Sequence, residues 1–210
     1  MSSNLTERTV LFYGIRKVEI YCRFIYWVAI MENLVIDSNM IEGVQHVLFS
    51  PYGDKRGTFR ETFRAEWFPQ VDWSNIQANR SDSDANVLRG LHYHHHQFDY
   101  WLTPRGYIRV ALCDLRANKS TFRSVEIVEM RGDSLSGLLI PPGVAHGFLT
   151  LTEATVNYIV SNYYDGKDEY GVAWDDPDLD VPWEAENPQV SFRDQSNPLF
   201  RDLNGEALLG

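Results

Sequence analysis

Residues 107–115 read YIRVALCDL, a short run in which β-branched and other apolar side chains predominate. Such runs are typical of β-strands, and comparable ones occur at residues 44–50 (VQHVLFS), 56–63 (RGTFRETF) and 156–164 (VNYIVSNYY). Turn-forming stretches such as MRGDSLSG (130–137) separate them. Short strands at intervals of roughly ten residues, without long helical periodicity, predict one all-β domain with a few short helices, a sandwich or barrel of the jelly-roll type.

The chain is acidic and poor in cysteine. Its 210 residues are enough for one well-buried domain and carry a formal net charge of −10. This charge repels phosphate backbones, so nucleic acid is not an expected partner, although a few arginines can still hold the diphosphate of a small ligand. Cys22 and Cys113 lie far apart without a CxxC spacing, which predicts a reducing, cytoplasmic location. Arg23 interrupts the apolar run at residues 21–30, which is too short to span a bilayer, so no membrane partner is expected.

The chain divides into three regions by sequence texture. Residues 1–40 are predicted to be an N-terminal extension, either not native to the protein or packed on a partner subunit. Residues 41–184 hold the β-rich pattern and are predicted to form the jelly-roll catalytic domain. Residues 185–210 form a polar C-terminal tail.

Histidines are concentrated in residues 89–101, RGLHYHHHQFDYW, which hold four of the chain's six. Alternate residues of a strand point to one face, so His92 and His94 can share a ligand sphere. Together with Asp99 and with His146 of the PPGVAHGF turn, they form a set that suits a divalent transition metal such as zinc, iron, nickel or manganese. At this point a metal site, a proton-transfer site and a solvated loop all remain open.

Five stretches in consistent order carry a resemblance to a known family. They are RGTFRETF (56–63), IQANRSDSDANVLRGLHY (76–93), IPPGVAHGFLTL (140–151), NYIVSNYYDGKDEYGVAWDDPDL (157–179) and VSFRDQSNPL (190–199). Together they resemble the dTDP-4-dehydrorhamnose 3,5-epimerase family of the cupin superfamily, over about residues 41 to 200. The resemblance implies a cupin-type jelly roll, a double-stranded β-helix, and a homodimer that works without metal or another cofactor.

The resemblance also implies a reaction, the epimerisation of a dTDP-linked 4-keto-6-deoxyhexose in deoxysugar biosynthesis. A base removes the proton at C3 or C5, next to the C4 ketone, and an acid returns a proton on the other face. By motif, His92 is the implied base, because imidazole accepts protons near neutral pH. Asp194, supplied by the C-terminal tail, would orient His92, and Tyr158 would be the proton donor. Tyr163 and Tyr164 are expected to serve mainly in packing.

The same matching implies substrate-binding roles for a further set of residues. They are Arg56, Glu61, Gln77, Asn79, Arg89, His146, Glu169 and Arg193. Arginines would hold the diphosphate, while amides and rings would suit the base and the sugar.

Two positions depart from the family pattern. Asp99 stands where the family has a lysine that is implied to stabilise the negative oxygen at C4, and His94 replaces a glutamine. An ionised carboxylate would repel that oxygen. Three alternatives follow: His94 or another cation replaces the lysine; His92, His94, Asp99 and His146 bind a metal in a metal-dependent cupin enzyme; or the chain is a catalytically silent protein that binds a sugar nucleotide.

Overall fold

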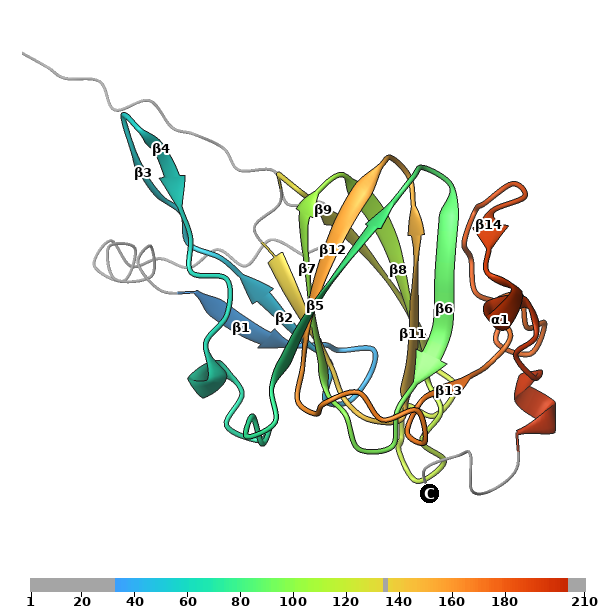
Figure 1. Ribbon diagram of the computed structural model, residues 1–210. Coiled ribbons are helices and arrows are strands. Elements are labelled where there is room, and N and C mark those ends of the chain that lie inside the picture. Colours follow the sequence, from blue (N-terminus) through green and yellow to red (C-terminus); the bar gives the residue numbers. More distant parts are fainter. Residues whose placement is uncertain (1–32, 134–135, 204–210) are drawn as a thin grey trace, which may run out of the picture. The chain divides into compact units, whose positions relative to one another are not determined.

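The computed structural model describes residues 33–133 and 136–203, which form two large β-sheets that face each other and a separate two-stranded sheet (Figure 1). The strands are β1 (Leu34–Asp37), β2 (Gln45–Leu48), β3 (Tyr52–Asp54), β4 (Gly57–Phe59), β5 (Gln77–Ser83), β6 (Val87–Tyr93), β7 (Asp99–Arg105), β8 (Tyr107–Asp114), β9 (Val125–Arg131), β10 (Ser136–Ile140), β11 (Val144–Thr150), β12 (Ala154–Val160), β13 (Tyr170–Gly171) and β14 (Gln189–Val190). The helices are short: η2 (Ala65–Trp67), α1 (Phe192–Gln195) and η3 (Phe200–Asp202).

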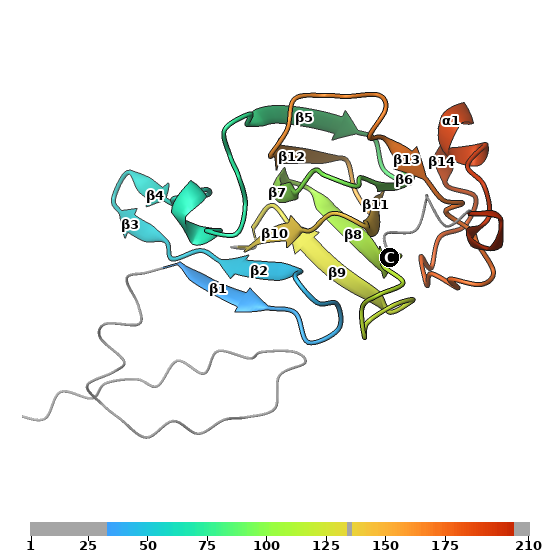
Figure 2. The same cartoon turned by 90° about the horizontal axis from the view of Figure 1, so that it is seen from below.

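The two sheets have the strand exchange of a jelly roll. The first sheet has the order β1-β2-β10-β7-β12-β5 and the second the order β13-β6-β11-β8-β9, so strands that are neighbours in the chain often lie in opposite sheets. Figure 2 shows the two layers from below. The predicted all-β jelly roll with a few short helices is confirmed.

Two strands lie in regions that were predicted to be outside the jelly-roll domain. Strand β1 falls within residues 1–40 and pairs along its length with β2, so the first sheet begins before residue 41. Strand β14 falls within residues 185–210 and pairs in parallel with β6. Residues 1–32 of the predicted extension, which was placed at residues 1–40, lie outside the described residues.

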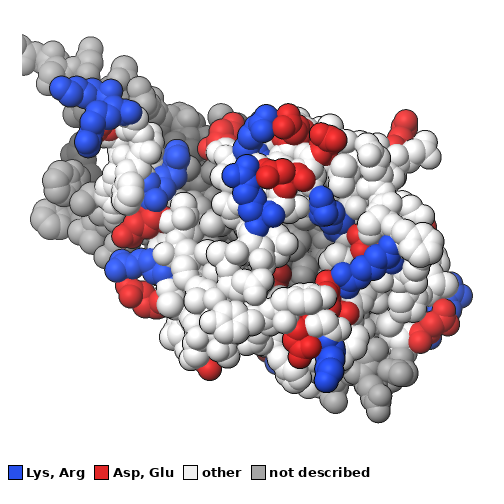
Figure 3. Space-filling view, viewed as in Figure 1, with Lys and Arg blue, Asp and Glu red and all other residues white. Residues whose placement is uncertain are grey.

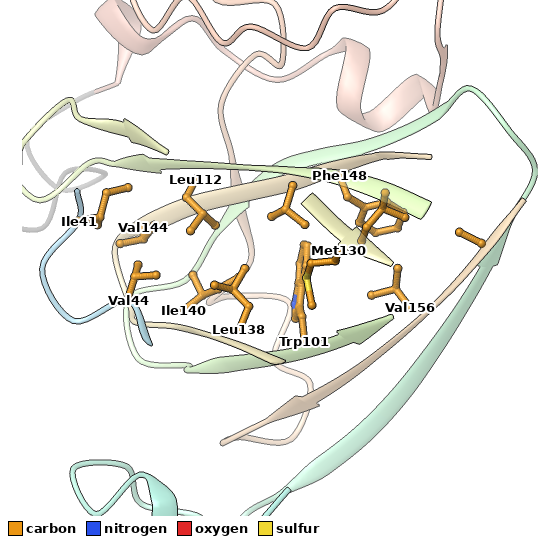
Figure 4. Packing of buried hydrophobic residues seen from close by; sticks show 13 residues of the cluster. Ile41, Val44, Trp101, Leu112, Met130, Leu138, Ile140, Val144, Phe148 and Val156 are labelled. Atoms are coloured by element: carbon orange, nitrogen blue, oxygen red, sulfur yellow. The ribbon is translucent and has the colours of Figure 1, made fainter. Parts of the chain in front are cut away.

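The core fills the space between the sheets (Figure 4). Strand β8 shows how the sequence builds it: Ile108, Val110 and Leu112 point inward to the inter-sheet cluster, while Ala111 and Cys113 point to the outer face of the second sheet. Burial of each large aliphatic side chain contributes about 1.5–3 kcal/mol, which holds the inner face of the strand. The smaller Ala111 and Cys113 are buried on the other face, so apolar residues predominate along YIRVALCDL and do not alternate strictly with polar ones.

The chain after β12 covers the outer face of the second sheet. Val172, Leu179 and Trp183 are buried against that face, and Trp183 donates its indole N–H to the Trp174 carbonyl at 2.8 Å. This packing fixes the C-terminal segment beside β6 and places α1 next to it. A functional residue in α1 can therefore meet one in β6.

The hairpin β3–β4 extends away from the two sheets (Figures 1 and 2). Among the described residues on the face shown in Figure 3, basic side chains stand next to acidic ones and form no extended basic patch. Ion pairs in the described part of the chain include Arg80–Asp82 at 2.9 Å and Arg105–Glu153 at 3.0 Å. Among the described residues, no helix has the length and apolar character needed to cross a membrane.

Candidate active site

A β-bulge in β6 brings Arg89 and His92 to the same side of the second sheet. In the pairing with β11, His92 lies opposite His146 and Arg89 lies opposite Phe148. Three residue steps along β6 therefore correspond to two along β11. The extra residue in β6 reverses the face to which the side chains beyond it point, compared with strict alternation. Two residues that strict alternation would send to opposite faces both line one cavity.

Gly90 and Gly147 make this bulge possible. Gly90 has φ +124°, which side chains rarely adopt, and a Cβ on it would lie 2.6 Å from Gly147 Cα. A Cβ on Gly147 would in turn lie 2.6 Å from the Arg89 carbonyl oxygen. Only glycines allow β6 and β11 to approach this closely beside His92.

A cavity of about 930 Å³ is lined by residues of both sheets and of the C-terminal segment. This volume lies at the upper end of small-molecule pockets, which measure about 300–1,000 Å³, and suits a ligand as large as a sugar nucleotide. All predicted site residues except Arg56 and Glu61 line it: His92, Tyr158, Asp194, Gln77, Asn79, Arg89, His146, Glu169 and Arg193, together with His94 and Asp99.

His92 and Asp194 form an imidazole–carboxylate pair in the wall of the cavity. The imidazole Nε2 of His92 lies 2.7 Å from Oδ1 of Asp194, and the backbone N–H of Gly90 donates to Oδ2 at 3.3 Å. Ser191 caps α1 by accepting the backbone N–H of Asp194 at 3.1 Å, which fixes the helix turn that carries the carboxylate. Burial opposes ionisation of Asp194, but the bonds from His92 and Gly90 outweigh it and lower its pKa below the usual value. An ionised, oriented carboxylate thus holds one nitrogen of His92.

Tyr158 stands on the facing sheet. Its neighbours on the adjacent strands are Asn79 of β5 and Trp101 of β7, and directly opposed residues share a face, so all three line the cavity. Burial raises the pKa of Tyr158, the charge of Asp99 raises it further, and Arg89 partly offsets both. The phenol is therefore held in its protonated form, as a proton donor requires.

The polar rim of the cavity is built from paired side chains. Arg193 of α1 forms an ion pair with Glu169. Burial would raise the pKa of Glu169, but the bond from Arg193 lowers it below the usual value. Arg89 donates from Nε to Ser83 Oγ at 3.0 Å, which leaves the rest of its guanidinium for another acceptor.

The structure does not bring Arg56 and Glu61 to this cavity within one chain. Arg56 lies at the tip of the hairpin β3–β4 with its side chain 84% exposed and pairs with Asp54 at 2.6 Å. Glu61 follows the hairpin and lies 3.7 Å from Arg64. Arg56 therefore lies on the hairpin that extends away from the sheets, whereas the carbonyl oxygen of Glu61 accepts a hydrogen bond from Asn33, next to β1.

Three of the four residues in the alternative metal set converge. One possible ligand atom from each of His94, Asp99 and His146 lies within 4.8 Å of the others. His92 is not in this group, and its Nε2 pairs with Asp194 instead. The sequence motif predicts that the other three residues converge, whereas the contact of His92 with Asp194 joins residues that lie far apart in the chain.

Three residues that line the cavity were not predicted to do so. Tyr163 and Tyr164 were expected to pack, but their exposures are 63% and 71% and both line the cavity. Asp168 also lines it; its carboxylate accepts the backbone N–H groups of His95 at 2.7 Å and His96 at 3.1 Å and so holds the histidine loop in place. Adjacent aromatic residues and an aspartate in a polar loop give no sequence signal that separates these roles from solvation or packing.

Comparison with known proteins gives one consistent family. The model of the family described as dTDP-4-dehydrorhamnose 3,5-epimerase matches residues 38–202. The spore coat polysaccharide biosynthesis protein SpsL of Bacillus subtilis is 35% identical over 156 residues, which cover 70% of this chain and 99% of that protein. The dTDP-4-dehydrorhamnose 3,5-epimerase of Shigella flexneri is 32% identical over 167 residues, or 75% of this chain and 92% of that protein.

A solved structure extends the likeness to three dimensions. The dTDP-6-deoxy-D-glucose-3,5-epimerase RmlC from Legionella pneumophila, in complex with dTDP-4-keto-L-rhamnose, has a TM-score of 0.78 and 29% identity. The match covers 84% of this chain and 97% of that one. The resemblance inferred from the five motifs is confirmed, and epimerases of this family act without a cofactor, as predicted for the family.

Proposed function

The chain belongs to the dTDP-4-dehydrorhamnose 3,5-epimerase family, a family of isomerases, and we propose that it inverts C3, C5 or both in a dTDP-linked 4-keto-6-deoxyhexose. The observation that carries the proposal is the 2.7 Å contact between His92 and Asp194, in a cavity whose opposite sheet carries Tyr158. A base and an acid on facing walls match a reaction that removes a proton from one face of a ring and returns one to the other.

In the proposed mechanism, Asp194 accepts the Nε2–H of His92, so the neutral ring has its lone pair on Nδ1. This nitrogen takes the proton from the carbon beside the ketone, and the electron pair of the C–H bond moves into the enolate. Tyr158 then gives its phenolic proton to the same carbon from the other face, which inverts the centre. Exchange with water returns a proton to Tyr158 and removes one from His92.

The proposed binding mode uses the rim of the cavity. Arg89 and Arg193 are the cations suited to the diphosphate, since guanidinium groups bind phosphate oxygens bidentately. Gln77 and Asn79 present amide groups to the sugar or the base, and Nε2 of Gln77 already donates to Oδ1 of Asn79 at 2.8 Å. The exposed rings of Tyr163 and Tyr164 offer faces on which a nucleobase can stack.

Solvent exchange tests this function. The protein is incubated with dTDP-4-keto-6-deoxyglucose in deuterated water, and the sugar is examined by NMR for deuterium at C3 and C5. We expect exchange at one or both positions, and its loss in the variant His92→Asn. Binding of the sugar nucleotide without exchange in the wild-type protein would instead identify a catalytically silent binding protein.

The chain offers a matched control for the His92 variant. His46 also forms an imidazole–carboxylate pair, with its Nε2 2.9 Å from Glu126, but neither residue lines the cavity. His46→Asn therefore removes an equivalent pair away from the proposed chemistry. Exchange should persist in His46→Asn and disappear in His92→Asn.

We further propose a homodimer in which the hairpin β3–β4 of one chain completes the cavity of the other. Arg56 and Glu61 carry the family motif but lie outside the cavity of their own chain, and Phe59 on the same hairpin is 66% exposed. An apolar ring on an extended hairpin suits contact with a second copy.

The cytoplasmic location remains a proposal, supported by buried Cys113, which is free.

Subunit mixing tests the shared site. Each of the variants Arg56→Ala and His92→Asn, when assayed alone, is expected to catalyse deuterium exchange into the sugar slowly. When the two are co-expressed and the mixed dimer is isolated, one of its two cavities receives a wild-type hairpin and a wild-type His92. Recovery of exchange supports the shared site, whereas a mixed dimer as slow as its parents contradicts it.

A further inference from the structure

We propose that His94, Asp99 and His146 bind one divalent transition-metal ion. The three residues come from separate parts of the fold: His94 follows β6, Asp99 begins β7 and His146 lies in β11. One possible ligand atom of each lies within 4.8 Å of the other two, inside the cavity wall. The proposal concerns ion binding alone, so it can fail or succeed independently of the proposed epimerase activity.

Both imidazoles are held in the tautomer that a metal ligand needs. Nδ1 of His146 lies 2.9 Å from the Val144 carbonyl oxygen, and Nδ1 of His94 bonds to the Asp168 carbonyl oxygen. A carbonyl can only accept, so each Nδ1 carries the proton and each neutral ring has its lone pair on Nε2. Metal-binding histidines commonly have this arrangement, with the other ring N–H donated to a backbone carbonyl.

The imidazole of His146 is buried beside Asp99, with 6% of its side chain exposed. Its Nε2 lies 3.6 Å from Asp99 Oδ2, too far for a normal hydrogen bond. A lone pair and a carboxylate oxygen thus face each other across a short gap that a cation would fill.

Asp99 has no lysine or arginine partner among the described residues. The side chain is 6% exposed and accepts two neutral donors, Gln97 Nε2 at 2.7 Å and Trp101 Nε1 at 3.1 Å. No lysine or arginine in the described ranges forms an ion pair with it, unlike buried Asp114, which Arg116 approaches to 2.7 Å. A buried carboxylate is costly unless it is paired or coordinates a metal, and here the second arrangement is available.

The spacing fits an ion of the size of Zn²⁺. Ligand atoms about 2.0–2.2 Å from a tetrahedral ion lie about 3.3–3.6 Å from one another. The separation of His146 Nε2 and Asp99 Oδ2 is 3.6 Å, so these two need no rearrangement. Closing the widest pair from 4.8 Å at most requires a shift of about 1 Å in a half-buried side chain such as His94. Two imidazoles and one carboxylate suit Zn²⁺, Co²⁺, Ni²⁺ and Fe²⁺.

The experiment measures ion binding directly. The full chain is treated with a chelator, dialysed, and titrated with Zn²⁺ by calorimetry and with Co²⁺ by visible absorption. We expect one ion per chain, and at least a 100-fold loss of affinity in His94→Gln and in Asp99→Asn. His96→Gln is the matched control, because His96 is in the same loop, lines the cavity and is not in the group, so its affinity should equal that of the wild type.

Two results would overturn the proposal. The first is the absence of saturable binding of either ion. The second is binding that both His94→Gln and Asp99→Asn leave unchanged, which would mean an adventitious ion at another group. Circular dichroism checks that each variant is folded, and if Asp99→Asn fails to fold, the result for His94→Gln decides.

Discussion

Replacement of Asp194 by asparagine should disable His92 by changing its tautomer. The carboxylate of Asp194 accepts two donors, the backbone N–H of Gly90 and the Nε2–H of His92. An amide keeps the size of the side chain but has one accepting and one donating end. If its oxygen accepts Gly90 N–H, its NH₂ faces Nε2, which must then be the lone-pair nitrogen. The proton moves to Nδ1, the atom proposed to act as the base.

The structure allows an estimate of the size of this effect. The opposite amide orientation would set the NH₂ against Gly90 N–H and leave a buried donor unsatisfied, at a cost of about 1–3 kcal/mol. The unproductive tautomer is therefore favoured by about 5- to 140-fold. In addition, an amide is a neutral hydrogen-bond partner where the carboxylate was a charged one. This change weakens the stabilisation of the imidazolium that forms during the reaction by about 1–1.5 kcal/mol. Together these terms amount to about 2–4.5 kcal/mol and predict that Asp194→Asn slows the reaction by about 30- to 1,600-fold.

The assay is the rate of solvent deuterium exchange at saturating substrate, with the affinity for dTDP measured separately. We expect the rate to fall and the affinity to change little, because the tautomer affects the proton transfer and not the nucleotide. Glu126→Gln, which alters the equivalent carboxylate beside His46, should leave the rate unchanged. An exchange rate for Asp194→Asn within threefold of the wild type would refute the proposed positioning role.

The same variant has a signature in stability. The pKa of Asp194 is lower in the folded chain than the value of about 3.9 expected when it is unfolded. Its ionised form is therefore stabilised by folding: this contribution is fully present above the unfolded pKa and is lost as the pH falls through the folded pKa. The stability difference between wild type and Asp194→Asn, measured by urea unfolding, should be largest near pH 7 and shrink below about pH 4.

Three further variants test other parts of the site. Tyr158→Phe should retain dTDP binding but lose inversion, measured by NMR as exchange without a change of configuration or as no exchange. Asp99→Lys should lower the thermal midpoint and give no gain in exchange, because donors such as Trp101 Nε1 lose their acceptor at about 1–3 kcal/mol each; a faster exchange rate would show that only a cation was missing. Gly90→Ala should destabilise the chain and reduce exchange, since its Cβ would meet Gly147 Cα at 2.6 Å; a wild-type melting curve would contradict the account of the bulge.

Much of the fold follows from local sequence, and the reason is visible in β8. Its apolar run is buried on both faces by the inter-sheet and outer clusters, so the pattern of side chains and the burial agree. The edge strands are harder to predict. Among the described strands, β1 pairs with β2 alone, and its Leu34 and Ile36 are exposed, so its short sequence does not distinguish it from a segment outside the domain. Its pairing depends on a partner strand that the local pattern does not specify.

The site is less accessible to sequence reasoning, because its geometry depends on a register shift. Alternation correctly places His92 and His94 on one face, but it would place Arg89 on the other. The bulge that corrects this is signalled only by Gly90, and a lone glycine in a strand has several explanations. Motif resemblance identified Arg89 without explaining it, whereas the shifted pairing with β11 explains it.

The position of Asp99 follows from packing and not from its chemical type. At the start of β7 it lies opposite Val160 of β12 and Ile140 of β10, so any residue there must enter the cavity wall. A lysine at this point would carry its own charge into the cavity, whereas aspartate brings a negative charge that Gln97 and Trp101 only partly satisfy. His94 and His146 supply two lone pairs beside it. In the proposed metal site, this position recruits a cation in place of the lysine that the family resemblance implies, and loss of ion binding in the His94 variant tests this arrangement.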